Sequence, residues 1–227
     1  MKNVIDFLND LVANNNKEWF DKNRARYKEV QSSFNSFTES LIKGIASFDP
    51  AISNLGVKDC TYRIYRDIRF SKDKTPYKNH MGAFIAPKGK CGGFAGYYFH
   101  IEGNGADYIG SHLLSSGVYR PLPVVIKSIR EEIMLNGGEF VKAIDSAKGF
   151  SIERIDMLKR VPAGFPSDSE YADLFRLKDY FLSREISEDF LTDKNLLENC
   201  VAEFKKTYEF NRILNKAIEY AYEEEGN

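Results

Sequence analysis

The side chains best suited to chemistry gather in residues 60–80, which we call the charged segment. Its six basic residues minus its two acids give it a net charge of +4, in a chain whose net charge is −1. Arginine presents a planar donor fork that matches phosphate or carboxylate, and lysine adds a mobile positive charge. We therefore predict a binding site for a small anionic ligand that bears phosphate or carboxylate, and such a site can also be catalytic. The candidate ligand-binding residues are Arg63, Arg66, Arg69, Lys72, Lys74, Tyr77 and Lys78.

The two acids of the charged segment, Asp67 and Asp73, leave an alternative open. They can orient the arginines of a binding site, or they can neutralise them in a structural salt-bridge network that holds no ligand. In the first hypothesis Asp67 orients an arginine or acts as a base, so it is a candidate catalytic residue. In the alternative the protein is a non-enzymatic interaction module.

Nucleic-acid binding is the third hypothesis. Tyr62, Tyr65 and Tyr77 lie among the basic residues and can stack on bases. The acidic excess elsewhere in the chain ranks this hypothesis below the other two.

The chain has three histidines, His80, His100 and His112, and all follow closely on the charged segment. His80 and His100 are the candidate proton-transfer residues. His100 and Glu102 lie two apart on a predicted strand, so with His112 they are weak candidates for a metal site of two histidines and one carboxylate. Hydrogen-bonded strand histidines are the default interpretation.

The turn at Gly103-Asn104-Gly105 decides whether His112 can join that set. A two-residue turn sends His112 to the face opposite His100. A three-residue loop pairs His100 with Tyr108 and leaves both histidines on one face. We expect the three-residue loop, because it avoids opposed carboxylates and gives better cross-strand pairs.

Period-two alternation predicts the strands that position these residues. Residues 62–70 alternate apolar and polar side chains, except that Arg66 falls on the apolar face and needs a bend or an acidic partner such as Asp67. Residues 81–86, 97–101 and 108–114 predict further strands, and the last two form a hairpin.

Helical periodicity dominates both ends of the chain. Large apolar residues recur every seven positions from Phe20 to Phe48, which predicts a long helix. It either lies on the sheet or forms a dimerising coiled coil, and its aromatic residues favour the sheet. After residue 121 we predict further helices, including residues 171–182 and a last helix from about residue 194 to residue 223.

Together these elements predict an α+β fold with a mainly antiparallel central sheet, covered by the long N-terminal helix and a C-terminal helical group. We expect residues 1–227 to form a single domain, helical over 1–50, sheet over 57–115 and helical over 121–225.

The composition, and the absence of common sequence motifs, limit the classes of protein to which the chain can belong. The chain is 43% hydrophobic and 29% charged, and it has no run of about 18 apolar residues and no signal-peptide pattern, so we expect a cytoplasmic protein without membrane contact. The three cysteines form no CxxC pair. Signatures such as GxxxxGK[ST], GxGxxG, GxSxG and HExxH do not occur, so the sequence assigns no cofactor.

The segments RIYRDIRFSKDKTPYK, NNNKEWFDKNRARY and GYYFHIE are similar to a bacterial family of about 230 residues, catalogued as a domain of unknown function. Its hallmark is Arg-x-x-Arg-Asp-x-Arg-Phe, followed by Asp/Asn-Lys and then Tyr. The matching residues here are Arg63, Arg66, Asp67, Arg69, Phe70, Asp73, Lys74 and Tyr77. The later segments LKRVPAGFP and LFRLKDYFLSRE also resemble the family. The resemblance implies one domain and assigns no activity.

Overall fold

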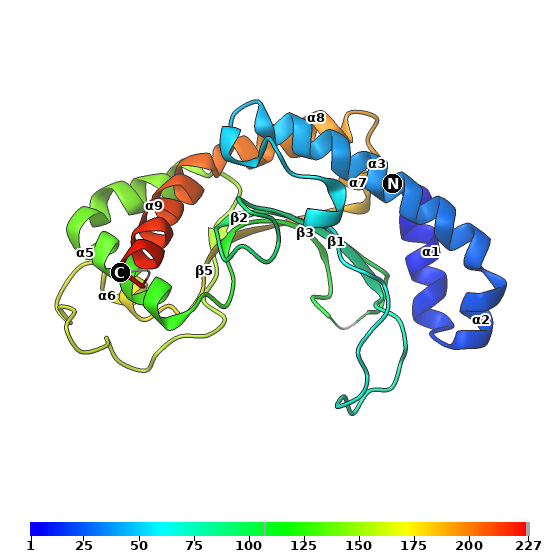
Figure 1. Cartoon of the computed structure of the whole chain (residues 1–227), viewed down its shortest axis with the longest axis horizontal. Helices are drawn as coiled ribbons and strands as arrows, with labels where there is room; N and C mark the ends of the chain where they lie inside the picture. The colour runs from blue at the N-terminus through cyan, green and yellow to red at the C-terminus, as the bar shows by residue number, and fades with distance from the viewer. Residues whose placement is uncertain (107, 226–227) are drawn as a thin grey trace.

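An antiparallel sheet of five strands lies at the centre of the computed structural model, which describes residues 1–106 and 108–225 (Figure 1). The strands follow one another across the sheet in the order β1-β2-β3-β5-β4. Their bounds are β1 His80–Ile85, β2 Gly96–Glu102, β3 His112–Val118, β4 Ser151–Ile152 and β5 Tyr180–Ile186. The predicted α+β class and its antiparallel sheet are confirmed.

Helices precede and follow the strands along the chain. The N-terminal helices are α1 Lys2–Ala13, α2 Lys17–Lys22 and α3 Arg24–Ala46, followed by a short 3-10 helix, η1 Pro50–Ile52, and by α4 Val57–Cys60. The later helices are α5 Pro123–Ser146, α6 Ala172–Phe175, α7 Glu188–Thr192, α8 Leu196–Lys206 and α9 Tyr208–Glu225. Each helix in the described part of the chain is too short or too polar to cross a membrane.

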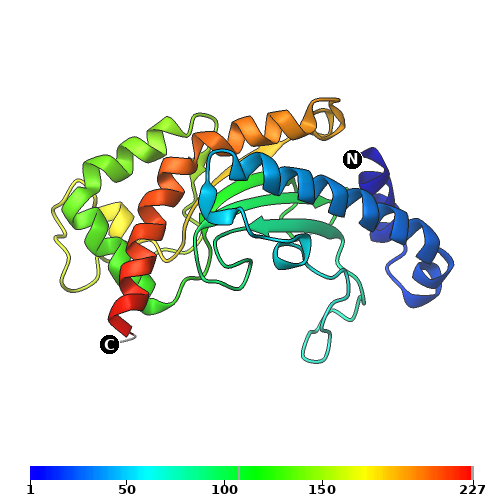
Figure 2. The ribbon, with the colours of Figure 1, turned by 45° about the horizontal axis from the view of Figure 1, so that its top comes forward.

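The long helix α3 lies across the sheet, as its aromatic stripe predicts. The ring of Phe99 in β2 lies 4.9 Å from that of Phe37 and 6.3 Å from that of Phe34. Phe34 is 1% exposed, so its burial against the sheet stabilises this layer by about 2 kcal/mol. Helix α8 runs beside α3 over the same face (Figure 2).

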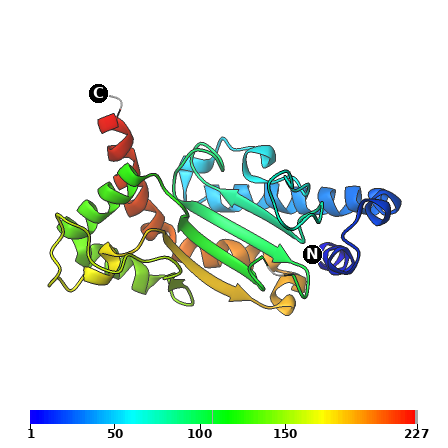
Figure 3. The ribbon, with the colours of Figure 1, turned by 90° about the horizontal axis from the view of Figure 1, so that it is seen from below.

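The opposite face of the sheet, which we call the lower face, carries a different set of side chains. Seen from below, the strands lie in front of α3 and α8 (Figure 3). Because side chains alternate along a strand, the neighbours of Phe99 point to the lower face. These neighbours are Tyr98 and His100, and Glu102 follows at the next alternate position.

The predicted strand over residues 62–70 is wrong. The chain forms α4 where the sheet was expected to begin, and then a loop with isolated bridges at Thr61 and Tyr65. Within the loop the backbone turns back on itself, and Lys78 donates its N–H to Ile64 O at 2.8 Å. The alternation therefore reflects one buried residue, Ile64, between exposed ones, and Phe70 is 95% exposed.

The sheet also extends beyond residues 57–115, because β4 and β5 come from the region predicted as helical. The predicted helix over 171–182 ends at Phe175, and β5 begins at Tyr180. In β5 the buried residues Tyr180, Leu182 and Ile186 alternate with less buried ones, which is a strand pattern that the neighbouring helical spacing hid.

The long terminal helices are each interrupted once. Asn23 separates α2 from α3, and Thr207 separates α8 from α9. Asn136 has non-helical dihedral angles inside α5, one residue before Gly137. The single-domain organisation stays a prediction, and one continuous cluster of buried residues joins the sheet to both helical groups.

Candidate functional site

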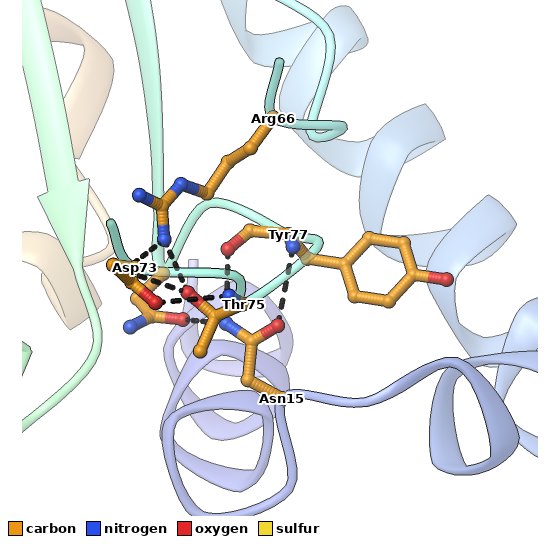
Figure 4. A network of polar contacts seen from close by, with 6 residues as sticks. Asn15, Arg66, Asp73, Thr75 and Tyr77 are labelled. Atoms are coloured by element: carbon orange, nitrogen blue, oxygen red, sulfur yellow. Dashed lines mark hydrogen bonds and ion pairs between the residues drawn. The ribbon is translucent and has the colours of Figure 1, made fainter. Parts of the chain in front are cut away.

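Arg66 closes the charged segment into a loop. Its guanidinium bonds both the Asp73 carboxylate and the Thr75 hydroxyl, as Figure 4 shows. Hydrogen bonds from the Thr75 N–H, from Arg66 and from the Thr75 hydroxyl lower the pKa of Asp73 to about 2. Asp73 is therefore the acidic partner of Arg66, rather than the expected Asp67. Asp67 instead accepts hydrogen bonds from Nε and Nη2 of Arg69 at 2.9 and 2.7 Å.

The N-terminal helices and the connection between α1 and α2 hold the returning part of this loop, at Tyr77. The Asn15 side chain accepts the Tyr77 N–H at 3.1 Å and donates to Tyr77 O at 2.9 Å, so it replaces a strand partner (Figure 4). The Tyr77 ring stacks on Phe20 at 3.9 Å and is 4% exposed. Tyr77 is thus an anchor of the charged segment.

We expect the Arg66→Gln variant to exchange the Lys78 amide hydrogen roughly five- to thirtyfold faster, because losing one modest interaction shifts a local opening equilibrium by that factor. Arg69→Gln is the matched control, since the Arg69 side chain is 76% exposed and its ion pair is with Asp67, at the surface. Equal exchange rates in the two variants would contradict a structural role for Arg66.

Two lysines lie over the ring of Tyr62, and Arg63 lies near one of them, Lys78; we call Arg63, Lys78 and Lys90 the cation cluster. The Lys78 Nζ lies 5.4 Å and the Lys90 Nζ 5.9 Å from the ring centroid. Burial and the nearby Arg63 guanidinium lower the pKa of Lys78. In the described part of the chain, no ion pair joins Arg63, Lys78 or Lys90 to an acid. Lys78 therefore carries a positive charge that no described carboxylate offsets at ion-pair distance.

The lower face also holds a buried carboxylate, Glu102, which is 2% exposed. The backbone N–H groups of Tyr108, Ile109 and Gly110 donate to it at 2.8 to 3.2 Å, and His100 Nε2 lies 3.0 Å away. Burial alone raises the pKa of Glu102, but His100 and these N–H groups outweigh it and lower the value to about 2. Glu102 is therefore ionised at neutral pH.

His80 lies opposite Glu102 on the neighbouring strand. Its ring stacks on that of Tyr108 at 4.0 Å, and its Nδ1 is buried with no hydrogen-bond partner among the described residues. Burial, together with His100 and Lys78, lowers the pKa of His80 to about 3. His80 is thus a neutral imidazole between the cation cluster and Glu102.

The predicted hairpin register is wrong. The connection between β2 and β3 spans residues 103–111, and His100 lies opposite Leu113 instead of Tyr108. Since paired residues share a face, His112 lies on the face opposite His100. Its Nδ1 accepts the Glu102 N–H at 3.1 Å. Among the described residues, no three His, Cys, Asp or Glu side chains form a cluster suited to a metal ion.

The predicted site residues fall into separate groups. The lower-face group contains Lys78, His80 and His100, while Tyr77 is buried on the other side against the N-terminal helices. At the tip of the loop, Lys72 is exposed and Lys74 donates to Ile68 O at 3.0 Å.

Two residues of the lower face were not in the predicted set. Tyr98 donates to or accepts from His100 Nδ1 at 2.8 Å, and Lys90 joins Lys78 at Tyr62. Spacing of two along GYYFHIE places Tyr98 with His100 and Glu102 on one strand face, so the sequence held that signal. No local pattern marks Lys90, which reaches the site from the turn after β1.

In a comparison with protein-family models, the model of a conserved hypothetical protein family, DUF2461, matches residues 3–212. The chain belongs to this family. The resemblance to a domain of unknown function is therefore confirmed, and the match to DUF2461 includes both the charged segment and the lower-face residues. Neither the comparison with curated proteins nor the comparison with solved structures found a match.

Proposed function

We propose that the protein binds a small ligand bearing phosphate or carboxylate at the cation cluster, on the lower face of the sheet. The observation that carries the proposal is Lys78, a half-buried ammonium without an acidic partner among the described residues. Its burial costs free energy that a bound anion offsets. Uncompensated positive charge on a partly desolvated surface also attracts anions from solution.

The neighbours of Lys78 suit the same ligand. Arg63 is exposed and offers a planar donor fork for two oxygens. Lys90 is held in place by donating to Lys58 O at 2.5 Å, while its charge lies over Tyr62. Of the predicted ligand-binding residues the proposal thus assigns direct contact to Arg63 and Lys78, and adds Lys90.

Of the other predicted ligand-binding residues, Arg66 and Tyr77 shape the loop that carries Arg63 and Lys78. Arg66 and Tyr77 hold the loop closed and anchored, and Arg69 is occupied by Asp67. The alternative of a structural network is therefore supported for Arg66 with Asp73. It does not account for Lys78, which has no acid to neutralise it in the described part of the chain.

Titration calorimetry with pyrophosphate at constant ionic strength tests the proposal. We expect the wild-type protein to bind, and Lys78→Gln to bind about tenfold more weakly, which corresponds to about 1.4 kcal/mol. The matched control is Lys142→Gln, an exposed lysine of α5, which should bind as the wild type does. Equal affinity in the wild type and Lys78→Gln would contradict the proposal. A single-stranded oligonucleotide tests the nucleic-acid alternative, which requires affinity that falls steeply with salt.

A further inference from the structure

Three side chains on alternate positions of β2 form a hydrogen-bonded chain on the lower face. Tyr98 Oη lies 2.8 Å from His100 Nδ1, and His100 Nε2 lies 3.0 Å from Glu102 Oε2. The chain runs from a buried carboxylate, through a fully buried imidazole, to a tyrosine that is partly exposed. Of the three residues, Tyr98 is therefore the one that is partly exposed.

The ionised Glu102 fixes the direction of these hydrogen bonds. A carboxylate only accepts, so the His100 nitrogen that faces it, Nε2, carries the hydrogen. In the neutral imidazole Nδ1 is then a free acceptor, and it takes the hydrogen bond from the Tyr98 hydroxyl. This is the arrangement of an acid that orients a histidine and a histidine that acts as base to a hydroxyl.

The neighbouring strand makes room for the hydroxyl and places charge beside it. A Cβ atom at Gly82 would lie 2.5 Å from Tyr98 Oη, so any side chain there would displace the hydroxyl. The ladder of β1 and β2 continues to Asn79, whose carbonyl accepts the Gly103 N–H at 2.9 Å. Lys78 and His80 therefore share the face of Gly82. The cation cluster and the Tyr98 hydroxyl thus lie on the same face of adjacent strands.

We propose that Tyr98, His100 and Glu102 form a nucleophilic relay that acts on an anionic ester, such as a phosphomonoester. In the first step Tyr98 Oη bonds to phosphorus, the bond from phosphorus to the leaving oxygen breaks, and the phenol proton moves to His100 Nδ1 and on to that oxygen. Water then attacks phosphorus and gives a proton to His100, and the phosphorus–Oη bond breaks as Tyr98 recovers a proton.

Desolvation makes the base necessary. Burial raises the pKa of Tyr98, and the neighbouring Tyr108, Tyr62 and Glu102 raise it further, so the hydroxyl is protonated at neutral pH. A protonated phenol is a weak nucleophile unless a base removes its proton as the new bond forms. His100 is in hydrogen-bond reach to do so, and Glu102 stabilises the imidazolium that results.

Labelling with 4-fluorosulfonylbenzoate, an anionic electrophile, tests the relay without knowledge of the natural ester. The reaction forms a sulfur–Oη bond, releases fluoride and passes the phenol proton to His100. We expect peptide mass spectrometry to show Tyr98 labelled on the order of tenfold faster than Tyr119 and Tyr220, two tyrosines that are 58% and 53% exposed.

Two variants and one spectroscopic measurement separate a relay from a structural chain. His100→Gln removes the base, and Glu102→Gln presents an amide donor that favours the other histidine tautomer, so each should slow Tyr98 labelling by about tenfold or more. In the folded wild-type protein, nitrogen NMR should show His100 with hydrogen on Nε2 at neutral pH. Hydrogen on Nδ1, or unchanged labelling in a folded variant, would overturn the proposal.

The relay's preference for an anionic ester, and so for an anionic probe, rests on the proposed anion-binding function. An uncharged probe therefore distinguishes the two proposals. If 4-methylbenzenesulfonyl fluoride labels Tyr98 as fast as the anionic probe, and pyrophosphate gives no protection, the relay stands and the anion site fails. If both probes label Tyr98 no faster than Tyr119, while pyrophosphate still binds, the relay fails and the anion site stands.

Discussion

The Glu102→Ala variant should lose about 3–5 kcal/mol of its free energy of unfolding, as expected when one partner of a buried charged network is removed. The substitution leaves the N–H groups of Tyr108, Ile109 and Gly110 without their acceptor. It also leaves His100 Nε2 unpaired in a fully buried position. Urea unfolding followed by circular dichroism measures the change.

Glu185→Ala is the matched control for this substitution. Glu185 lies on the same sheet, in β5, but is exposed and makes no ion pair with a described residue. Its loss should change the free energy of unfolding by no more than about 0.5 kcal/mol. Similar losses in the two variants would show that Glu102 holds no special position in the fold.

Acid should weaken the fold through the same carboxyl. The pKa of Glu102 is about 2 in the folded protein, against an ordinary value of 4.5, so the unfolded chain takes up the proton first as the pH falls. Its contribution, about 3 kcal/mol, is complete above pH 4.5 and is lost progressively down to about pH 2. Glu102→Gln should lack that part of the pH dependence.

The second large effect is expected at Phe20, which connects the N-terminal helices to the charged segment. Phe20→Ala should cost about 3–5 kcal/mol of stability, because the ring is fully buried and its removal leaves a cavity. The lost ring stacks on Tyr77 at 3.9 Å and lies 5.9 Å from Tyr65. Thermal or urea unfolding measures the loss, and hydrogen exchange at the Tyr77 amide should accelerate with it.

Phe70→Ala gives the matched control, since it removes the same side chain from the tip of the charged segment, where Phe70 is 95% exposed. We expect its unfolding to match that of the wild type within about 0.5 kcal/mol. An equal loss in Phe70→Ala and Phe20→Ala would mean that the N-terminal helices do not position the segment.

The elements with long, regular patterns could be predicted from the sequence. Helix α3 and strands β1 and β2 lie where apolar periodicity placed them, because a stripe of large side chains has few ways to be buried. For residues 62–70, the same kind of pattern could not distinguish a strand from an irregular loop. Their apparent alternation needs a partner strand, and only the folded chain shows that residues 61–79 fold back on themselves.

The sequence predicted where the candidate site lies along the chain, but not most of the contacts within it. Arg66 was recognised as misplaced and in need of an acid, but the acid proved to be Asp73, seven residues away, since the loop brings it closer than Asp67. The side of the sheet that His112 faces depended on the length of the connection between β2 and β3. This connection has nine residues instead of the three expected. The spacing in the sequence puts Tyr98 on the strand face of His100, and the structure adds the hydrogen bond between the two side chains.

Backbone NMR of the wild-type protein during titration with pyrophosphate tests the central claim most directly, because it maps where an anion binds. We predict that the largest shift changes cluster at Tyr62, Lys78, His80 and Lys90, and that amides of α5 and α9 stay unchanged. Shift changes centred on Arg69 and Lys72 at the loop tip, or an absence of changes on the lower face, would contradict the account.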